Sequence, residues 1–125
     1  GGEALLKMYE LKTSRLLQAA CVCGCIIGGG SEEEIKQADA YGKSLGLAFQ
    51  IVDDILDVTG DQETLGKPIG SDAVNNKETY VSLYGVEAAR EKAAELTNEA
   101  LKALEFFDDN DFLTELTKQL LNRSK

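Results

Sequence analysis

The stretch Phe49-Gln50-Ile51-Val52-Asp53-Asp54-Ile55-Leu56-Asp57 combines two patterns that rarely occur together. Its apolar residues predict a helix with one buried face. Its three aspartates, Asp53, Asp54 and Asp57, fall within about one helical turn. Aspartate is a poor helix former, and like charges four residues apart repel each other. Because burial of an unpaired carboxylate is costly, we expect a cation to meet these side chains.

Two interpretations of this acidic cluster are open. Hard oxygen ligands with no His or Cys beside them suit Mg²⁺, which proteins commonly bind through one or two carboxylates together with a substrate phosphate. The alternative is the solvent-exposed end of a helix with an acidic face. The spacing of the aspartates does not decide between a metal site and such a helix end.

The segments before and around the cluster also predict helices, because apolar residues recur at three- and four-residue steps and the chain has one proline. The first helix is expected at 3–27, where Gly28-Gly29-Gly30 stops it. Ser31 and Glu34 match a capping box, so a second helix is expected from 31 to about 59. Its expected apolar face comprises Ile35, Ala38, Leu45, Ala48, Phe49, Val52 and Leu56.

The rest of the chain predicts one long loop and three more helices. Residues 60–78 lack a helical pattern, and loops of this length in a compact domain are usually functional or disordered. Helices are expected at about 79–84, 86–106 and 110–122. The last two should bury, respectively, Val86, Ala89, Ala93, Leu96, Ala100 and Leu104, and Phe112, Leu113, Leu116 and Leu120. The predicted fold is all-α, an antiparallel helical bundle in a single region at 1–125.

The overall composition narrows the possible partners. With 125 residues the chain is long enough for one domain, and its net charge of −9 argues against nucleic acid or an anionic membrane surface as the main partner. An anionic small molecule stays compatible, because a divalent ion and a few lysines set the local field. The absence of His excludes Ser-His-Asp and Cys-His catalysis and a mixed Cys/His zinc site. The longest apolar stretch, 16–27, is too short to span a bilayer.

Three cysteines, Cys21, Cys23 and Cys25, alternate within that apolar stretch. Disulfide frameworks and zinc sites need other spacings, so we expect small buried thiols in a reducing cytoplasm. The start, Gly1-Gly2-Glu3, has no basic-then-apolar pattern of a signal peptide, which leads to the same expectation of a cytoplasmic location.

A distance argument links the first helix to the acidic cluster. The tight turn near Gly29 should make the first two helices antiparallel, so residues about equally far from the turn should lie roughly level. Lys12, 17 positions before Gly29, should then lie in the neighbourhood of residues 48–50, with Asp53 about one turn further on.

The same register places Thr13 near Gln50, and the segment that carries Lys67 and Asp72 leaves from this end of the hairpin. This end of the hairpin would then carry an ammonium group, a hydroxyl, an amide and carboxylates close together. Such a set of groups suits a magnesium–diphosphate complex. Each residue alone has an ordinary interpretation: Lys12 as a surface salt-bridge partner, Gln50 as a polar spacer and Thr13 as a helix residue that bonds to its own backbone. Their joint occurrence favours the site.

These motifs resemble, in the same order, those of the carboxy-terminal part of trans-isoprenyl diphosphate synthases, the polyprenyl synthase family of the farnesyl and geranylgeranyl diphosphate synthase type. The matching pieces are Lys12-Thr13, Phe49-Gln50, Asp53-Asp54-Ile55-Leu56-Asp57, Gly66-Lys67-Pro68-Ile69-Gly70-Ser71-Asp72 and Asn76-Lys77-Glu78-Thr79-Tyr80. The resemblance covers nearly the whole chain. It implies an isoprenoid-synthase fold and a prenyltransferase that condenses isopentenyl diphosphate with an allylic diphosphate after Mg²⁺-assisted ionisation.

The resemblance also implies roles for the acidic residues. Asp53 and Asp54 would bind Mg²⁺, Asp53 directly, and Asp57 would be an outer or supporting member of the metal site. Asp72 would hold a metal-bound water.

Other residues would contact the substrates. Three lysines are expected near the allylic diphosphate: Lys12, Lys67 and Lys77. Thr13 and Gln50 would direct their dipoles at the developing allylic cation, and Phe49 would pack on the isopentenyl group.

The family's first aspartate-rich motif and its arginines for isopentenyl diphosphate have no counterpart in these residues, which implies a fragment of a larger synthase domain without its amino-terminal helices. We expect exposed inward helix faces and no activity of the fragment alone. The fragment should either dimerise, with a homodimer expected, or pair with a missing amino-terminal fragment. The tail, Arg123-Ser124-Lys125, resembles the family tail that closes over the site, but we expect it to be frayed. A non-catalytic subunit of a heteromeric prenyl synthase and a simple helical interaction module are the alternatives.

Overall fold

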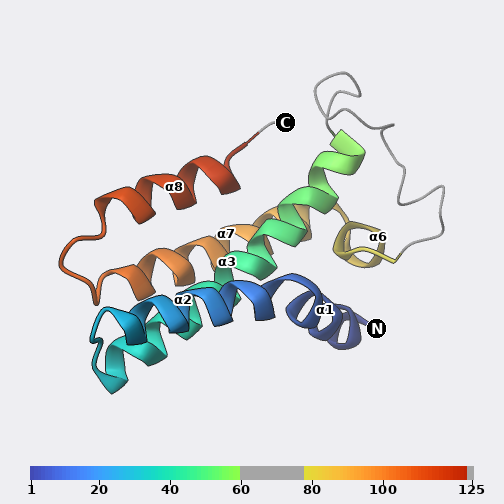
Figure 1. Cartoon of the computed structure of the whole chain (residues 1–125). Helices are drawn as coiled ribbons and strands as arrows, with labels where there is room; N and C mark the ends of the chain where they lie inside the picture. The colour runs from blue at the N-terminus through green and yellow to red at the C-terminus, as the bar shows by residue number, and fades with distance from the viewer. Residues whose placement is uncertain (60–77, 124–125) are drawn as a thin grey trace.

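The computed structural model describes residues 1–59 and 78–123. Every regular element within these two ranges is a helix, which confirms the all-α prediction (Figure 1). The elements are α1 (Gly2–Tyr9), η1 (Glu10–Ser14), α2 (Arg15–Ile27), α3 (Glu32–Thr59), α6 (Tyr80–Tyr84), α7 (Val86–Leu104) and α8 (Asp111–Leu121). None of these helices is both long enough and apolar enough to cross a membrane. The predicted loop at 60–78 falls, except for its last residue, outside the described residues.

Helix α3 is the centre of the bundle and packs against both α2 and α7 (Figure 1). Its start confirms the predicted capping box. The backbone N–H of Ser31 donates to Oε1 of Glu34 at 2.9 Å, and the N–H of Glu34 donates to the Ser31 hydroxyl at 3.2 Å. In the preceding turn Gly29 has a φ of 80°, which glycine adopts without steric cost. The two helices α2 and α3 therefore form the predicted antiparallel hairpin.

The core between α3 and α7 follows the predicted apolar faces. The buried predicted residues are Ala38, Leu45, Ala48, Val52 and Leu56 on α3, and Ala89, Ala93, Leu96, Ala100 and Leu104 on α7. The remaining predicted positions on these helices, Ile35, Phe49 and Val86, are half-buried. Small alanine side chains dominate the inner face of α7, which lets the two helices approach each other closely.

The first helix is not the continuous α-helix that the sequence predicts, because a π-helical turn interrupts it. In η1 the backbone N–H of Arg15 donates to the carbonyl oxygen of Glu10, five residues earlier. The turn accommodates one extra residue, and α1 and α2 meet at a bend there (Figure 1). Apolar periodicity does not reveal such a turn, since it shifts the pattern by a single residue.

Two glycines let α3 approach η1 and α2 closely. A Cβ atom on Gly46 would lie 2.6 Å from the Cα of Ser14, and one on Gly42 would lie 2.8 Å from the Cα of Gln18. Ser14 is fully buried at this contact, and its hydroxyl donates to the backbone carbonyl of Lys43 at 3.0 Å. This close contact fixes the position of η1 against α3.

The predicted inward face of the last helix is wrong. Three of its four predicted residues are exposed: Phe112, Leu113 and Leu116. Thr117 and Leu121 are buried instead, and the Thr117 hydroxyl forms a 2.7 Å hydrogen bond with the Tyr41 hydroxyl. Because a hydrogen-bonded hydroxyl is buried at little cost, α8 presents Thr117 to the bundle in place of its larger apolar residues.

Five large apolar side chains are exposed along the first helical segment: Met8, Leu11, Leu16, Ile26 and Ile27. That they form the inward face of a larger bundle stays a prediction. The prediction of buried thiols is wrong, since Cys23 is exposed and Cys21 and Cys25 are half-buried. The reason is that α2 packs on one side, against α3, and leaves its other side uncovered within the described part of the chain. Burial raises the pKa of the Cys21 thiol, and the nearby Asp39 adds to this shift.

Candidate functional site

The hairpin of η1 and α3 joins two polar residues that the sequence assigns to the site. The amide of Gln50 donates to the Thr13 hydroxyl at 2.5 Å. This contact confirms the prediction that Thr13 lies near Gln50. The observed register is centred between residues 31 and 32, whereas an equal count from Gly29 would pair Thr13 with Leu45. Both side chains are half-buried, so the helices hold them while part of each stays accessible.

A cavity of about 340 Å³ opens beside this pair. Lys12, Thr13 and Phe49 line the cavity together with Leu16, Leu17, Leu45 and Leu120. An exposed ammonium group, a hydroxyl and an aromatic ring thus border an apolar wall. Such a surface suits a ligand with one charged end and one apolar end.

Asp53 and Phe49 share a partner, Arg123, at the end of the chain. Its guanidinium lies 4.1 Å from the centroid of the Phe49 ring and 3.7 Å from Oδ1 of Asp53. The prediction of a frayed tail is therefore wrong for Arg123, whose side chain is 19% exposed; residues 124–125 lie outside the described residues. Burial lowers the pKa of Arg123 and the Asp53 carboxylate raises it, and the guanidinium stays charged at neutral pH.

We expect the substitution Phe49→Leu, which leaves the tail sequence unchanged, to release Arg123. A cation–π contact contributes about 0.5–2 kcal/mol, which corresponds to a change of about twofold to thirtyfold in the released population. Carboxypeptidase digestion of a polypeptide of residues 1–125, followed by mass spectrometry, should therefore trim the variant faster. The control is Lys118→Ala, at an exposed position of α8. Equal trimming of the wild type and the Phe49 variant would contradict the anchoring of Arg123.

Asp54 lies in a different environment from Asp53. It is 5% exposed, and its Oδ2 accepts hydrogen bonds from the Tyr9 hydroxyl and, at 3.2 Å, from the backbone N–H of Tyr80. Tyr9 ends α1 and Tyr80 begins α6, so a single carboxylate oxygen connects three helices. These donors reduce the cost of burying the charge.

The three aspartates differ in their access to solvent. The Asp53 side chain is 45% exposed, whereas Asp57 is 2% exposed and Asp54 is equally interior. The side chain of Asp54 projects from the helix about 100° away from that of Asp53. The side chain of Asp57 projects on nearly the same side as that of Asp53, about one turn further along the helix. Within residues 1–59 and 78–123, no three acidic, cysteine or histidine side chains gather as a metal site. Metal binding by the acidic cluster therefore stays a prediction.

Three further predicted site residues, Lys67, Asp72 and Lys77, lie outside the described residues. Their roles near the diphosphate and the metal stay predictions. The described residues Lys12, Thr13 and Phe49 line the cavity, and Gln50 is hydrogen-bonded to Thr13. Asp53 is linked to Phe49 through Arg123.

Sequence reasoning missed Tyr9, which could have been found once Thr13 was paired with Gln50, because positions 9 and 54 are level in the same register. For Arg123 the resemblance to the family tail was a signal, but fraying was expected, since the position of Arg123 depends on how α8 packs. That packing was the part of the predicted fold that proved wrong.

Comparisons with known proteins agree with this arrangement. The profile of the polyprenyl synthetase family matches residues 2–119. Geranylgeranyl pyrophosphate synthase 12, chloroplastic, of Arabidopsis thaliana is 50% identical over 110 residues, which are 88% of this chain and 31% of that protein. Geranylgeranyl pyrophosphate synthase 10, mitochondrial, of the same plant is 46% identical over 125 residues, 98% of this chain and 36% of that protein. The chain thus spans about a third of the length of these curated relatives.

Solved structures show the same helical arrangement. A crystal structure of a geranylgeranyl pyrophosphate synthase superposes with a TM-score of 0.88 at 30% identity, covering 97% of this chain and 51% of that one. A geranyltransferase from Helicobacter pylori, complexed with magnesium and isoprenyl diphosphate, gives a TM-score of 0.73 at 36% identity over 96% of this chain and 40% of that one. The predicted relation to the isoprenoid-synthase fold is confirmed.

Proposed function

The chain belongs to the polyprenyl synthetase family, and on this basis we propose that it is part of a trans-prenyltransferase that joins isopentenyl diphosphate to an allylic diphosphate. Because the chain spans about a third of its curated relatives, the reaction is proposed for the whole protein. The observation that carries the proposal is the hydrogen bond between Gln50 and Thr13, which holds two dipoles at the cavity that Lys12 borders.

Each residue at the cavity has a chemical role in this reaction. Lys12 would bind a diphosphate oxygen of the allylic substrate through a charge-assisted hydrogen bond. The Gln50 amide N–H is engaged by Thr13, which leaves the Gln50 amide oxygen to stabilise the positive charge that develops on the allylic carbon. Phe49 would pack on the isopentenyl group.

No histidine is needed for this chemistry. The C–O bond of the allylic diphosphate breaks, the double bond of isopentenyl diphosphate forms the new C–C bond, and a proton leaves to the departing pyrophosphate. Fixed charges and an apolar cavity wall would therefore replace a side-chain base, which is consistent with a chain that contains no His.

The donor set fits Mg²⁺. The acidic cluster offers oxygen ligands alone, and the Asp53 carboxylate is accessible. We propose Asp53 as the direct protein ligand and Asp54 and Asp57 as further members of the metal site. Mg²⁺, when bound, would neutralise the diphosphate and make it a better leaving group. The magnesium and isoprenyl diphosphate in the Helicobacter pylori geranyltransferase support this assignment by analogy.

Three residues outside the described ranges complete the proposed site. Lys67 and Lys77 would neutralise the remaining diphosphate charge, and Asp72 would hold a metal-bound water. These assignments rest on the order of the motifs along the chain and on its membership of the family.

We expect residues 1–125 alone to form no prenyl product. The exposed apolar residues of the first helical segment would be covered by the rest of the synthase domain, and half of the metal and substrate ligands would come from that part. The test incubates the purified fragment with labelled isopentenyl diphosphate, an allylic diphosphate and Mg²⁺. The full-length protein is the positive control. Product from the fragment alone would contradict this prediction, and no product from the full-length protein would overturn the proposed function.

Assembly and location are also proposals. We propose a homodimer, the commonest symmetric assembly of soluble proteins, with isoprenoid diphosphates as the small-molecule partners. A cytoplasmic location stays a prediction, and two of the relatives carry the names chloroplastic and mitochondrial. Fractionation of cells that express the full-length protein would test it.

A further inference from the structure

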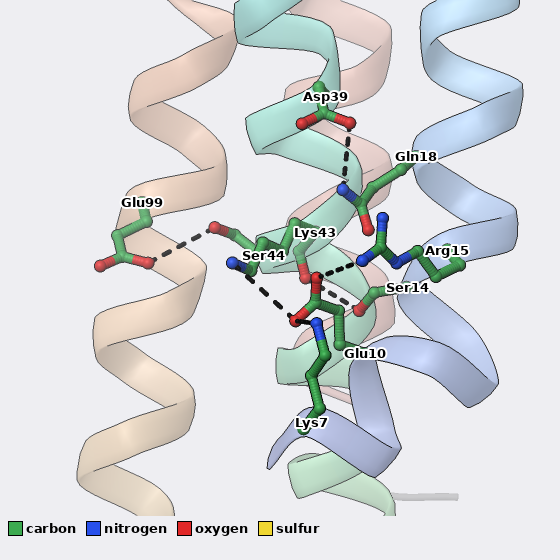
Figure 2. Close-up of polar contacts among 9 residues, drawn as sticks. All are labelled: Lys7, Glu10, Ser14, Arg15, Gln18, Asp39, Lys43, Ser44 and Glu99. Carbon is green, nitrogen blue, oxygen red and sulfur yellow. Dashed lines mark hydrogen bonds and ion pairs between the residues drawn. The ribbon is translucent and has the colours of Figure 1, made fainter. Parts of the chain in front are cut away.

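A network of four charged side chains surrounds Glu10 at the π-helical turn η1: Glu10, Lys7, Arg15 and Lys43 (Figure 2). The Glu10 carboxylate lies 3.6 Å from Lys7, 3.4 Å from Arg15 and 4.0 Å from Lys43. The Glu10 side chain is 14% exposed, whereas its three partners are at least half exposed. The partners belong to α1, α2 and α3, so this carboxylate connects all three helices at the turn.

The pair of Glu10 and Arg15 has the spacing of a π-turn. Residues five apart are about 140° apart around an α-helix, so their side chains do not face each other. In η1 the backbone N–H of Arg15 bonds to the Glu10 carbonyl, and the side chains of the same two residues meet at 3.4 Å. The ion pair therefore favours the π-turn over a continuous α-helix.

Ser14 supplies a second anchor at the other end of the turn. Its buried hydroxyl donates to the backbone carbonyl of Lys43, and Gly46 leaves the space for this approach. Lys43 thus contributes its backbone to Ser14 and its ammonium group to Glu10 (Figure 2). Both ends of η1 therefore contact Lys43 of α3.

Lys12 and Thr13 lie between these two anchors and line the cavity, whereas Glu10 does not. A continuous α-helix lacks the extra residue of the π-turn. In such a helix, α1 and the residues of η1 would be rotated by about 100° around the helix axis relative to α2. The contact of Thr13 with Gln50 depends on the direction in which η1 points the Thr13 side chain.

We propose that Glu10 is a positioning residue, which through Arg15 and Lys43 stabilises the π-turn that directs Lys12 and Thr13 at the diphosphate site. This proposal rests on the proposed function, because it assigns Glu10 a role in the same reaction. Glu10 acts through its neighbours and contacts no substrate.

The test uses Glu10→Gln in the full-length protein, which removes the charge and keeps the size of the side chain. Amide hydrogen exchange of Arg15 should become about two- to fivefold faster, since an ion pair of this kind contributes up to about 1 kcal/mol. The kcat should fall by about tenfold, because small displacements of positioned groups are costly. Glu10→Asp should recover part of both losses, and Glu10→Gln combined with Arg15→Gln should add little to the single change.

The control is Glu87→Gln on α7, which removes an ion pair with Arg90 (3.9 Å) far from the turn. It should change neither the exchange of Arg15 nor the kcat. An unchanged rate of amide hydrogen exchange at Arg15 in Glu10→Gln overturns the proposal. Faster exchange throughout α3 and α7 also overturns it, because it indicates general destabilisation. Faster exchange at the turn with a normal kcat also overturns it. The exchange measurement needs no catalysis, so an inactive full-length protein contradicts the proposed function separately from this test.

Discussion

Asp53→Asn in the full-length protein is expected to lower kcat/KM by about 10²–10³-fold, the loss typical of a group that stabilises charge in the transition state. Asparagine keeps the size of the side chain and removes the negative charge that the proposed Mg²⁺ site requires. Mg²⁺-dependent binding of inorganic pyrophosphate, measured by calorimetry, should be lost together with activity. Steady-state kinetics and calorimetry on the same preparation check both expectations.

Two further variants separate metal binding from other effects of this change. Asp39→Asn makes the same substitution on the same helix at an exposed position, where asparagine can still accept the hydrogen bond from Gln18. Arg123→Ala removes the ion pair with Asp53 but keeps the carboxylate. Both should retain Mg²⁺-dependent pyrophosphate binding. If Asp53→Asn binds pyrophosphate as tightly as Asp39→Asn does, Asp53 is not the metal ligand.

Gly46→Val is expected to lower the free energy of unfolding by about 3 kcal/mol, at the upper end of what overpacking usually costs. The new Cβ would meet the Cα of Ser14 at 2.6 Å, and this neighbour is backbone that no rotamer change can move. Helices η1 and α3 would have to separate, and the Ser14 hydroxyl would lose the Lys43 carbonyl. Urea unfolding of the full-length protein, followed by circular dichroism, measures the change.

The matched control is Gly24→Val in α2, where a new Cβ meets no atom within 4 Å among the described residues. This variant introduces the same side chain into a helix without the clash. A difference in the free energy of unfolding between the two variants therefore measures the contribution of the close contact between η1 and α3. Ser14→Ala in the Gly46→Val background should recover little stability, since the clash with the Cα remains. Equal stability of the Gly46 and Gly24 variants would show that the close approach is absent in solution.

Part of the site was predictable because its geometry is local. Ser31 and Glu34 identify the start of α3, and the glycines before them identify a short turn. A short turn between two long helices leaves a narrow range of antiparallel registers, so counting residues placed Thr13 in the neighbourhood of Gln50, and the structure fixed the pair itself.

Other parts of the site follow from contacts that no local pattern contains. The sequence shows that Asp54 lies in an apolar stretch, but not that Tyr9 and the backbone of Tyr80 donate to it. The order of apolar residues in α8 favours Phe112 as a core residue, yet the hydroxyl of Tyr41 makes Thr117 the better buried side chain.

The sequence by itself determined the helices, the antiparallel hairpin and the level of Lys12, Thr13 and Gln50 against the acidic cluster, because helical periodicity and capping act within a few residues. Only the tertiary structure decided the π-turn, the buried position of Asp54 and the docking of Arg123 on Phe49. Each of these features depends on contacts between helices far apart in the sequence, such as Tyr9 with Asp54, 45 residues later. A single contact of this kind contributes about 1 kcal/mol, so its presence is decided by the packing of the whole bundle and not by the residues around it.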